Sequence, residues 1–208
     1  MSMTGDGKRP GRLIAVEGID GTGKSTQIAL LADVLRQDGL EVVVTREPTD
    51  GVYGQQIRRL FQARDSVSRQ DELDLFLADR RDHVARLIAP ALEQGKVVVT
   101  DRYYFSTAAY QGGVGFDPET IIRQNELFAP VPDLVILIEL SPAHAVMRIQ
   151  RYRQDSLNHF EQEESLRQVA QVFKSLDRNY IKRVDGSQEI DVIHSQIVAH
   201  VKACLAAH

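Results

Sequence analysis

The most informative part of this chain reads Gly18-Ile19-Asp20-Gly21-Thr22-Gly23-Lys24-Ser25-Thr26. It follows an apolar run at residues 13–16 and opens a helix-like stretch, which is the context in which G-x-x-x-x-G-K-[ST] binds phosphate. Glycines let successive backbone N–H groups turn inward around phosphate oxygens, and the positive end of the following helix adds to that field. We therefore predict a nucleotide-binding loop, in which Lys24 faces the β- and γ-phosphates and Ser25 reaches Mg²⁺.

Short apolar runs recur along the chain at residues 13–16, 42–44, 97–99 and 134–138. They are continuous rather than alternating, as expected for parallel strands that are buried on both faces. Helix-like stretches separate them, and the gap between the second and third runs holds two, at about 54–64 and 71–94. This alternation predicts an α/β fold of three layers, with a parallel sheet of about five strands and helices on both faces.

Several residues indicate where helices begin and end. Gly39 and Gly95 stand where helices are expected to stop. Pro118 after Asp117, and Pro142 after Ser141, are typical of a first-turn proline behind an N-cap. Near-helical spacing in the last helix predicts a core-facing stripe of Ile190, Ile193, Ile197, Val201 and Leu205.

Composition narrows the function classes. The 208 residues carry 25 Lys plus Arg and 29 Asp plus Glu, so a net charge of −4 offers no broad basic surface for nucleic acid. No apolar run approaches the ~20 residues of a membrane span, and no N-terminal segment resembles a signal peptide. Cys204 has no partner for a disulfide, which fits a reducing, cytoplasmic location. We expect a loose, disordered tail over residues 1–11 and a single domain over 12–208.

The distribution of arginines separates two classes of nucleotide-binding protein. The chain contains no Asn-Lys-x-Asp tetrapeptide, which a GTPase would use for guanine. Arg46 and Arg102 instead end two of the apolar runs, and Arg58 follows at the start of a helix. Ligands of open α/β sheets bind beyond the carboxyl ends of the strands. We expect these arginines and the phosphate loop to meet in one crevice, as a kinase with two phosphorylated substrates requires.

At this point the sequence resembles the thymidylate kinase family, from Leu13 to the last helix. The resemblance rests on residues 17–25, on Thr45-Arg46-Glu47-Pro48, on residues 76–83 and on residues 101–112. It implies a P-loop kinase fold with a short mobile lid at about 148–161, and a homodimer. It also implies transfer of the ATP γ-phosphoryl group to dTMP, giving dTDP and ADP, with Mg²⁺ as cofactor.

The resemblance also implies roles for individual residues. Phe76 stacks on thymine, Arg80, Thr107 and Gln111 contact the base, and Tyr110 lies beside the sugar and favours a 2′-deoxy substrate. Arg46, Arg58 and Arg102 hold the acceptor phosphate, Asp20 lies near it, and Asp101 orients Mg²⁺ together with Ser25. The phosphate loop has no arginine before Lys24, so the catalytic arginines are expected in the lid, at Arg151 and Arg153 beside Arg148. Phe76 and Arg80, like Thr107 and Gln111, are four residues apart and share a helix face.

Three segments depart from the family pattern. Thr49-Asp50 stands where the family usually has two glycines. The segment 113–116 is one residue shorter than in many members and has no arginine. The segment 157–161 has no Asp-Arg pair before its aromatic residue and glutamate. Two alternatives therefore stay open: a P-loop kinase for another nucleotide or a deoxynucleoside, and a non-catalytic nucleotide-binding paralogue.

Overall fold

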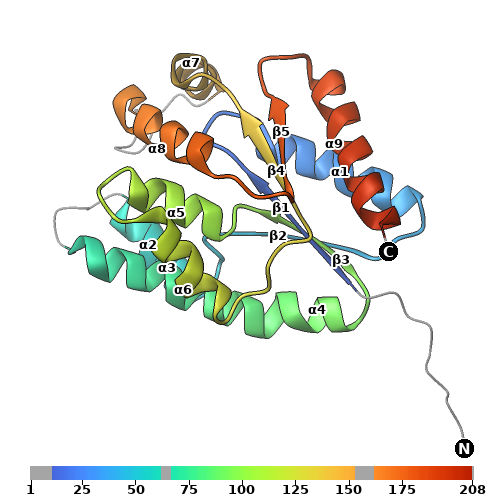
Figure 1. Cartoon of the computed structure of the whole chain (residues 1–208), viewed down its shortest axis with the longest axis horizontal. Coiled ribbons are helices and arrows are strands. Elements are labelled where there is room, and N and C mark those ends of the chain that lie inside the picture. Colours follow the sequence, from blue (N-terminus) through green and yellow to red (C-terminus); the bar gives the residue numbers. More distant parts are fainter. Residues whose placement is uncertain (1–10, 62–66, 153–161, 208) are drawn as a thin grey trace, which may run out of the picture.

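The computed structural model describes residues 11–61, 67–152 and 162–207 (Figure 1). Its centre is a sheet of five parallel strands in the order β2-β3-β1-β4-β5. The strands are β1 (Arg12–Glu17), β2 (Val42–Arg46), β3 (Val97–Asp101), β4 (Leu134–Glu139) and β5 (Ile181–Asp185). The predicted α/β architecture with a parallel five-stranded sheet is confirmed.

Helices cover both faces of the sheet, which makes the three layers visible in Figure 1. One face carries α1 (Lys24–Gln37) and α9 (Ile190–Ala206). The remaining helices are α2 (Val52–Leu60), α3 (Arg69–His83), α4 (Ala89–Glu93), α5 (Tyr104–Gly112), α6 (Pro118–Glu126), α7 (Pro142–Tyr152) and α8 (Glu163–Ser175). Side chains from α3 to α8 build the core of the opposite face. No helix among the described residues is long and apolar enough to cross a membrane.

The two cores explain why the central strands are continuously apolar. In β1, Leu13 and Ala15 face one core, whereas Ile14 and Val16 face the other. Away from the strand ends every side chain of such a strand is buried, so no polar alternation remains. The prediction is wrong for β2, which lies at the edge of the sheet and leaves 43% of Val44 exposed.

The sequence did not reveal β5. Its segment Ile-Lys-Arg-Val-Asp carries only two apolar residues, and Val184 alone is fully buried. The strand lies at the other edge of the sheet, where it pairs only with β4. A strand at the edge of the sheet does not need apolar side chains on both faces, so β5 has no continuous apolar run in the sequence.

Most predicted helix ends are confirmed. Gly39 and Gly95 adopt φ values of +82° and +78° directly after α1 and α4. The Asp117 carboxylate accepts a hydrogen bond from the backbone N–H of Thr120 and caps α6. The apolar stripe of α9 is only partly confirmed, because Ile190, the first residue of the helix, is 54% exposed.

The helix predicted over 71–94 is interrupted. A π-helical turn, Val84–Ile88, separates α3 from α4. Pro90 lies in the first turn of α4, and a proline has no backbone N–H to donate to the carbonyl group four residues earlier. The helix predicted over 54–64 is α2, which ends at Leu60; residues 62–64 lie outside the described part of the chain.

Gly54 fixes how α2 packs against the turn before it. A Cβ atom at this position would lie 1.9 Å from the carbonyl oxygen of Thr49, so only glycine lets the helix approach this backbone. This close approach matters because two of the predicted phosphate-binding arginines lie on either side of it. Arg46 is the last residue of β2, just before the turn, and Arg58 lies in the last turn of α2.

We expect Gly54→Ala to lower the free energy of unfolding by about 2–3 kcal/mol, because the added methyl group forces α2 off the turn. Chemical denaturation measures this loss. Gln56→Ala, on the exposed side of the same helix, serves as the control and is expected to change stability by less than about 0.5 kcal/mol. Equal stability of the two variants would contradict the packing argument.

Candidate active site

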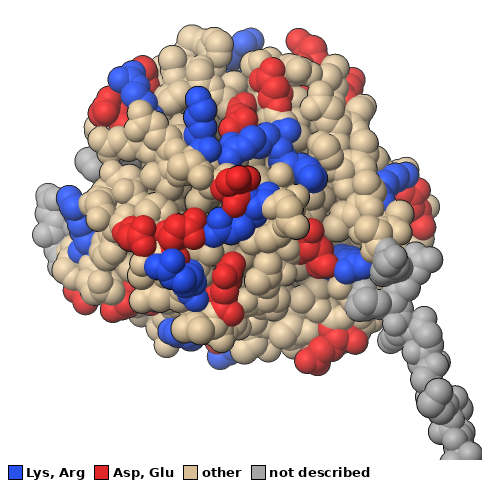
Figure 2. All heavy atoms as spheres, in the orientation of Figure 1, with Lys and Arg blue, Asp and Glu red and all other residues tan. Residues whose placement is uncertain are grey.

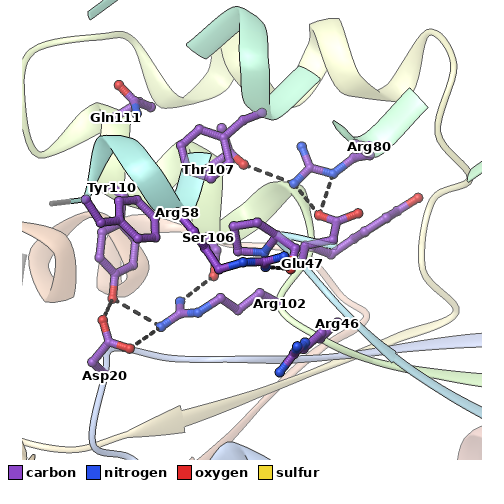
Figure 3. A pocket seen from close by; sticks show the side chains of 14 residues that line it. Asp20, Arg46, Glu47, Arg58, Arg80, Arg102, Ser106, Thr107, Tyr110 and Gln111 are labelled. Atoms are coloured by element: carbon purple, nitrogen blue, oxygen red, sulfur yellow. Dashed lines mark hydrogen bonds and ion pairs between the residues drawn. The ribbon is translucent and has the colours of Figure 1, made fainter. Parts of the chain in front are cut away.

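A pocket of about 330 Å³ opens beside the carboxyl ends of the central strands (Figure 3). It is lined by Asp20, Arg46, Glu47, Pro48, Arg58, Phe61, Phe76, Arg80, Arg102, Tyr103, Ser106, Thr107, Tyr110 and Gln111. All side chains predicted to bind the acceptor nucleotide are among them. The pocket is formed where the strand order reverses around β1, which is where open α/β sheets bind ligands.

The phosphate loop has the backbone that its glycines suggested. Gly18, Gly21 and Gly23 adopt positive φ values of 140°, 81° and 90°. The ammonium group of Lys24 folds into this loop and donates to the carbonyl oxygens of Gly18 and Ile19, at 3.0 and 2.9 Å. Burial lowers the pKa of Lys24 to about 8, and the nearby Arg102 guanidinium acts in the same direction. Asp20, Asp101 and Glu17 raise this pKa, and a phosphate group in the loop would act in the same direction.

The predicted magnesium ligands meet at the end of β3. The Ser25 hydroxyl donates to the Asp101 carboxylate across 2.7 Å. Hydroxyl and carboxylate oxygens suit Mg²⁺, which usually takes only one or two protein ligands and completes its shell with water and phosphate oxygens. Across the described residues, no cluster of three or more His, Cys, Asp or Glu side chains could hold a metal without such help. The pair therefore fits Mg²⁺ bound together with a nucleotide.

Arg102 joins the phosphate loop to the pocket. Its guanidinium donates to the Asp20 carboxylate at 2.8 Å and to the Ser106 hydroxyl at 2.8 Å (Figure 3). The Tyr110 hydroxyl donates to the other Asp20 oxygen at 2.7 Å. Burial alone would raise the pKa of Asp20, but Arg102 and Lys24 outweigh it and hold the pKa at about 2. Asp20 therefore stays ionised and keeps Arg102 oriented between loop and pocket.

Glu17 supports the backbone on which Arg102 is mounted. This fully buried carboxylate accepts hydrogen bonds from the backbone N–H groups of Tyr103 and Ser106, at 2.8 and 3.1 Å, and from the Ser106 hydroxyl. It thereby caps the start of α5 from the neighbouring strand. Burial raises the pKa of Glu17 to about 7, against the lowering effect of these hydrogen bonds and of Arg102. The sequence analysis did not reveal this supporting role of Glu17.

The opposite end of the pocket contains a buried ion pair. The Arg80 guanidinium, 2% exposed, donates to Glu47 through Nε at 2.9 Å, to Asn125 at 2.7 Å and to the Thr107 hydroxyl at 3.0 Å. His83 contacts the second Glu47 oxygen at 2.9 Å. Burial opposes ionisation of Glu47, but Arg80 and His83 keep its pKa below the usual value. Arg80 is thus held rigidly at the place where the family resemblance puts the base.

Gln111 differs from its neighbours in the pocket. Its side chain is fully buried, and neither atom of its amide group has a hydrogen-bond partner among the described residues. A buried amide without partners costs free energy that a ligand with a matching donor and acceptor would recover. The amide is therefore a group in the pocket whose hydrogen bonds a ligand could complete.

Other residues take positions that the sequence did not specify. Tyr103, to which the sequence analysis gave no role, lines the pocket, and its ring centre lies 5.4 Å from the Arg80 guanidinium carbon. Glu47 stands inside the quoted Thr-Arg-Glu-Pro motif, so the sequence indicated its place at a strand end but not its pairing with Arg80.

In the predicted lid, Arg151 is exposed on α7 and Arg148 is half-buried. Arg153 and the unusual segment 157–161 lie outside the described residues.

We expect Glu17→Gln to change how stability depends on pH. Native Glu17 keeps its proton up to about pH 7, whereas the unfolded chain releases it near 4.5, so the wild type loses stability as pH rises through this interval. Relative to the variant, the wild type should lose about 2–3 kcal/mol of unfolding free energy between about pH 5 and pH 8. Denaturant titrations at both pH values measure the difference; parallel curves for the two proteins would contradict it.

Comparison with known proteins agrees with this geometry. The family model described as thymidylate kinase matches residues 16–197. A thymidylate kinase of Desulfotalea psychrophila is 50% identical over 196 residues, which cover 94% of this chain and 96% of the relative. Thymidylate kinases of Xanthomonas campestris and Akkermansia muciniphila are each 44% identical, covering 94% and 99% of this chain and 85% and 96% of the relatives. The chain therefore belongs to the thymidylate kinase family.

Proposed function

We propose that this protein is an ATP-dependent kinase that transfers the γ-phosphoryl group of ATP to dTMP, giving dTDP and ADP. The observation that carries this proposal is the composition of one pocket. An arginine-rich end adjoins the phosphate loop through Arg102, and the other end presents the unpartnered Gln111 amide. Such a pocket suits a ligand that has a phosphate at one end and a hydrogen-bonding base at the other.

The reaction requires no general base from the protein. The second pKa of a phosphate monoester is near 6, so the acceptor is already mostly a dianion at neutral pH. One of its oxygens forms the new bond to the γ-phosphorus, the bond from that phosphorus to the bridging oxygen breaks, and ADP leaves with the electron pair. The obstacle is repulsion between two anions, which fixed cations overcome.

The residues around the phosphate loop supply these cations. Lys24 lies within the loop, and Arg102 reaches both the loop carbonyl of Gly18, at 3.3 Å, and the pocket. Arg46 and Arg58 line the pocket where the acceptor phosphate would bind. Mg²⁺, held by Ser25 and Asp101 together with ATP, would neutralise further charge on the phosphate oxygens. Guanidinium groups offer paired donors that match phosphate oxygens better than an ammonium group does.

The other end of the pocket favours thymine. Thymine presents an N–H donor beside a carbonyl acceptor, and the Gln111 amide offers one of each. Phe76, which lines the pocket, supplies a ring for stacking. Tyr110 and Asp20 are hydrogen-bonded to each other beside Arg102, where the sugar would connect base and phosphate. A ribose 2′-hydroxyl would have to compete with this closed pair.

Three further properties belong to the same proposal. We infer Mg²⁺ as the cofactor from the Ser25–Asp101 pair, and a homodimer from the family resemblance. A cytoplasmic location is in keeping with a single, half-buried thiol at Cys204. Catalytic roles for Arg151 and Arg153 remain predictions from the lid position in the sequence.

We expect ATP and Mg²⁺ to yield ADP rapidly with dTMP, and far more slowly with dUMP, UMP, dGMP or thymidine. A coupled ADP-release assay measures this panel, with ATP alone as the background. Comparison of dTMP with dUMP isolates the methyl group of thymine, and comparison of dUMP with UMP isolates the 2′-position of the sugar. Turnover with another acceptor would keep the kinase chemistry but reject the base assignment; no ADP above background with any acceptor would overturn the proposal.

We expect Gln111→Leu to lower kcat/KM for dTMP by about 10- to 100-fold, because a leucine of similar size offers neither donor nor acceptor to the base. KM for ATP should change less than about twofold, since Gln111 lies in the acceptor pocket and not in the phosphate loop. Steady-state kinetics with each substrate varied in turn separates the two effects. An unchanged kcat/KM for dTMP would remove Gln111 from base recognition.

A further inference from the structure

The Thr49-Asp50 segment, where the sequence departs from the family's glycine pair, contacts the arginines predicted to hold the acceptor phosphate. The Asp50 carboxylate accepts from Nη2 of Arg46 at 2.8 and 3.2 Å, and from Nη2 of Arg58 at 3.0 Å. These two guanidinium groups come from the end of β2 and from α2, and both line the pocket in Figure 3. One carboxylate therefore bridges two cations that a phosphate would be expected to bridge.

The backbone of this turn is fixed independently of the arginines. Asp79 accepts hydrogen bonds from the backbone N–H of Thr49 at 2.8 Å and from its hydroxyl at 2.5 Å. Asp79 is itself buried, with 2% of its surface exposed. Gly54 of α2 lies directly against the carbonyl group of Thr49. The turn therefore acts as a rigid support.

Arg58 uses this support for most of its hydrogen bonds. Its Nη1 donates to the carbonyl oxygen of Pro48 at 3.0 Å, and its Nη2 donates to that of Thr49 at 2.6 Å. These backbone partners remain in place as long as the turn does. The remaining partner, the Asp50 carboxylate, is a side chain that is 75% exposed and can rotate into solvent. Asp50 is thus the exchangeable partner of Arg58.

We propose that Asp50 is an internal counter-anion, which binds the Arg46 and Arg58 donors and is displaced from them by the phosphate group of the acceptor. This inference rests on the proposed function, because it takes these two arginines as the acceptor-phosphate site. The arginines keep the Asp50 pKa below its usual value, so the carboxylate is ionised at neutral pH. Two anions that use the same donors repel each other, so a bound phosphate drives the carboxylate away from these donors.

The exchange has a consequence for both substrate and product. Every phosphate-bearing ligand must break the Asp50 contacts before it binds, so its affinity is lower than the two arginines alone would provide. A ligand without a phosphate leaves Asp50 in place and bears no such loss. Because the product keeps the same phosphate, the internal anion also favours its release.

The test is Asp50→Asn, which keeps the size of the side chain and removes its charge. Isothermal titration with dTMP, inorganic phosphate and thymidine, each added to wild type and variant, gives the dissociation constants. We expect the variant to bind dTMP and phosphate about 3- to 10-fold more tightly, and thymidine within about twofold of the wild type. Asp33→Asn is the matched control: Asp33 is an exposed carboxylate that pairs with Arg36 on α1, away from the pocket, and its loss changes net charge equally.

Three results would overturn the inference. If Asp50→Asn weakens the binding of dTMP and phosphate but leaves the binding of thymidine unchanged, Asp50 orients the arginines and does not compete with the ligand. If all three ligands respond alike, or Asp33→Asn gives the same gain, Asp50 has no specific part. Inorganic phosphate carries no base, so its binding tests Asp50 separately from the proposed function. If the wild type does not turn over dTMP, the proposed function is rejected. The ratio of the phosphate dissociation constants of wild type and Asp50→Asn would still report on Asp50.

Discussion

The ion pair between Arg102 and Asp20 links the two halves of the site, and the central sheet holds it in place. Arg102 adopts φ of +70°, which is uncommon for a residue with a side chain. Three contacts hold this turn. The backbone N–H of Arg102 donates to the carbonyl oxygen of Val16 on β1, and the Thr100 hydroxyl donates to the carbonyl oxygen of Arg102. The Glu17 carboxylate accepts from backbone N–H groups at the start of α5. Parallel pairing of β1 with β3 therefore places the guanidinium beside the phosphate loop.

The two ends of the pocket are stabilised in different ways. At the base end, Glu47 and Arg80 form a buried pair whose remaining hydrogen-bonding groups meet His83, Asn125 and Thr107. Breaking such a pair leaves a buried charge uncompensated, so these contacts hold Arg80 and Glu47 in place. At the phosphate end, Arg46 and Asp50 are 63% and 75% exposed, so their contact is weak and readily exchanged.

Each cation of the site has partners within the protein. Lys24 is held by loop carbonyl groups, Arg102 by Asp20, and Arg46 and Arg58 by Asp50. Acidic and basic side chains are likewise intermingled on the molecular face in Figure 2. Under the proposed function, binding at the phosphate end exchanges internal partners for phosphate oxygens, and binding at the base end fills the unmet hydrogen bonds of Gln111.

The sequence by itself determined the glycine-rich loop and the parallel α/β architecture, because these depend on local motifs and on which strand each motif follows. Together with the family resemblance, it also indicated the predicted acceptor-binding residues that line the pocket, but not Tyr103. It did not reveal β5, the exposure of Val44 at the sheet edge or the π-helical turn at Val84–Ile88, since edge position and helix continuity depend on neighbours far along the chain. The partners of Glu17, Glu47 and Asp50 were likewise decided only by the tertiary structure. Buried carboxylates are stable only where folding brings cations and N–H groups to them, and no local pattern records which groups these are.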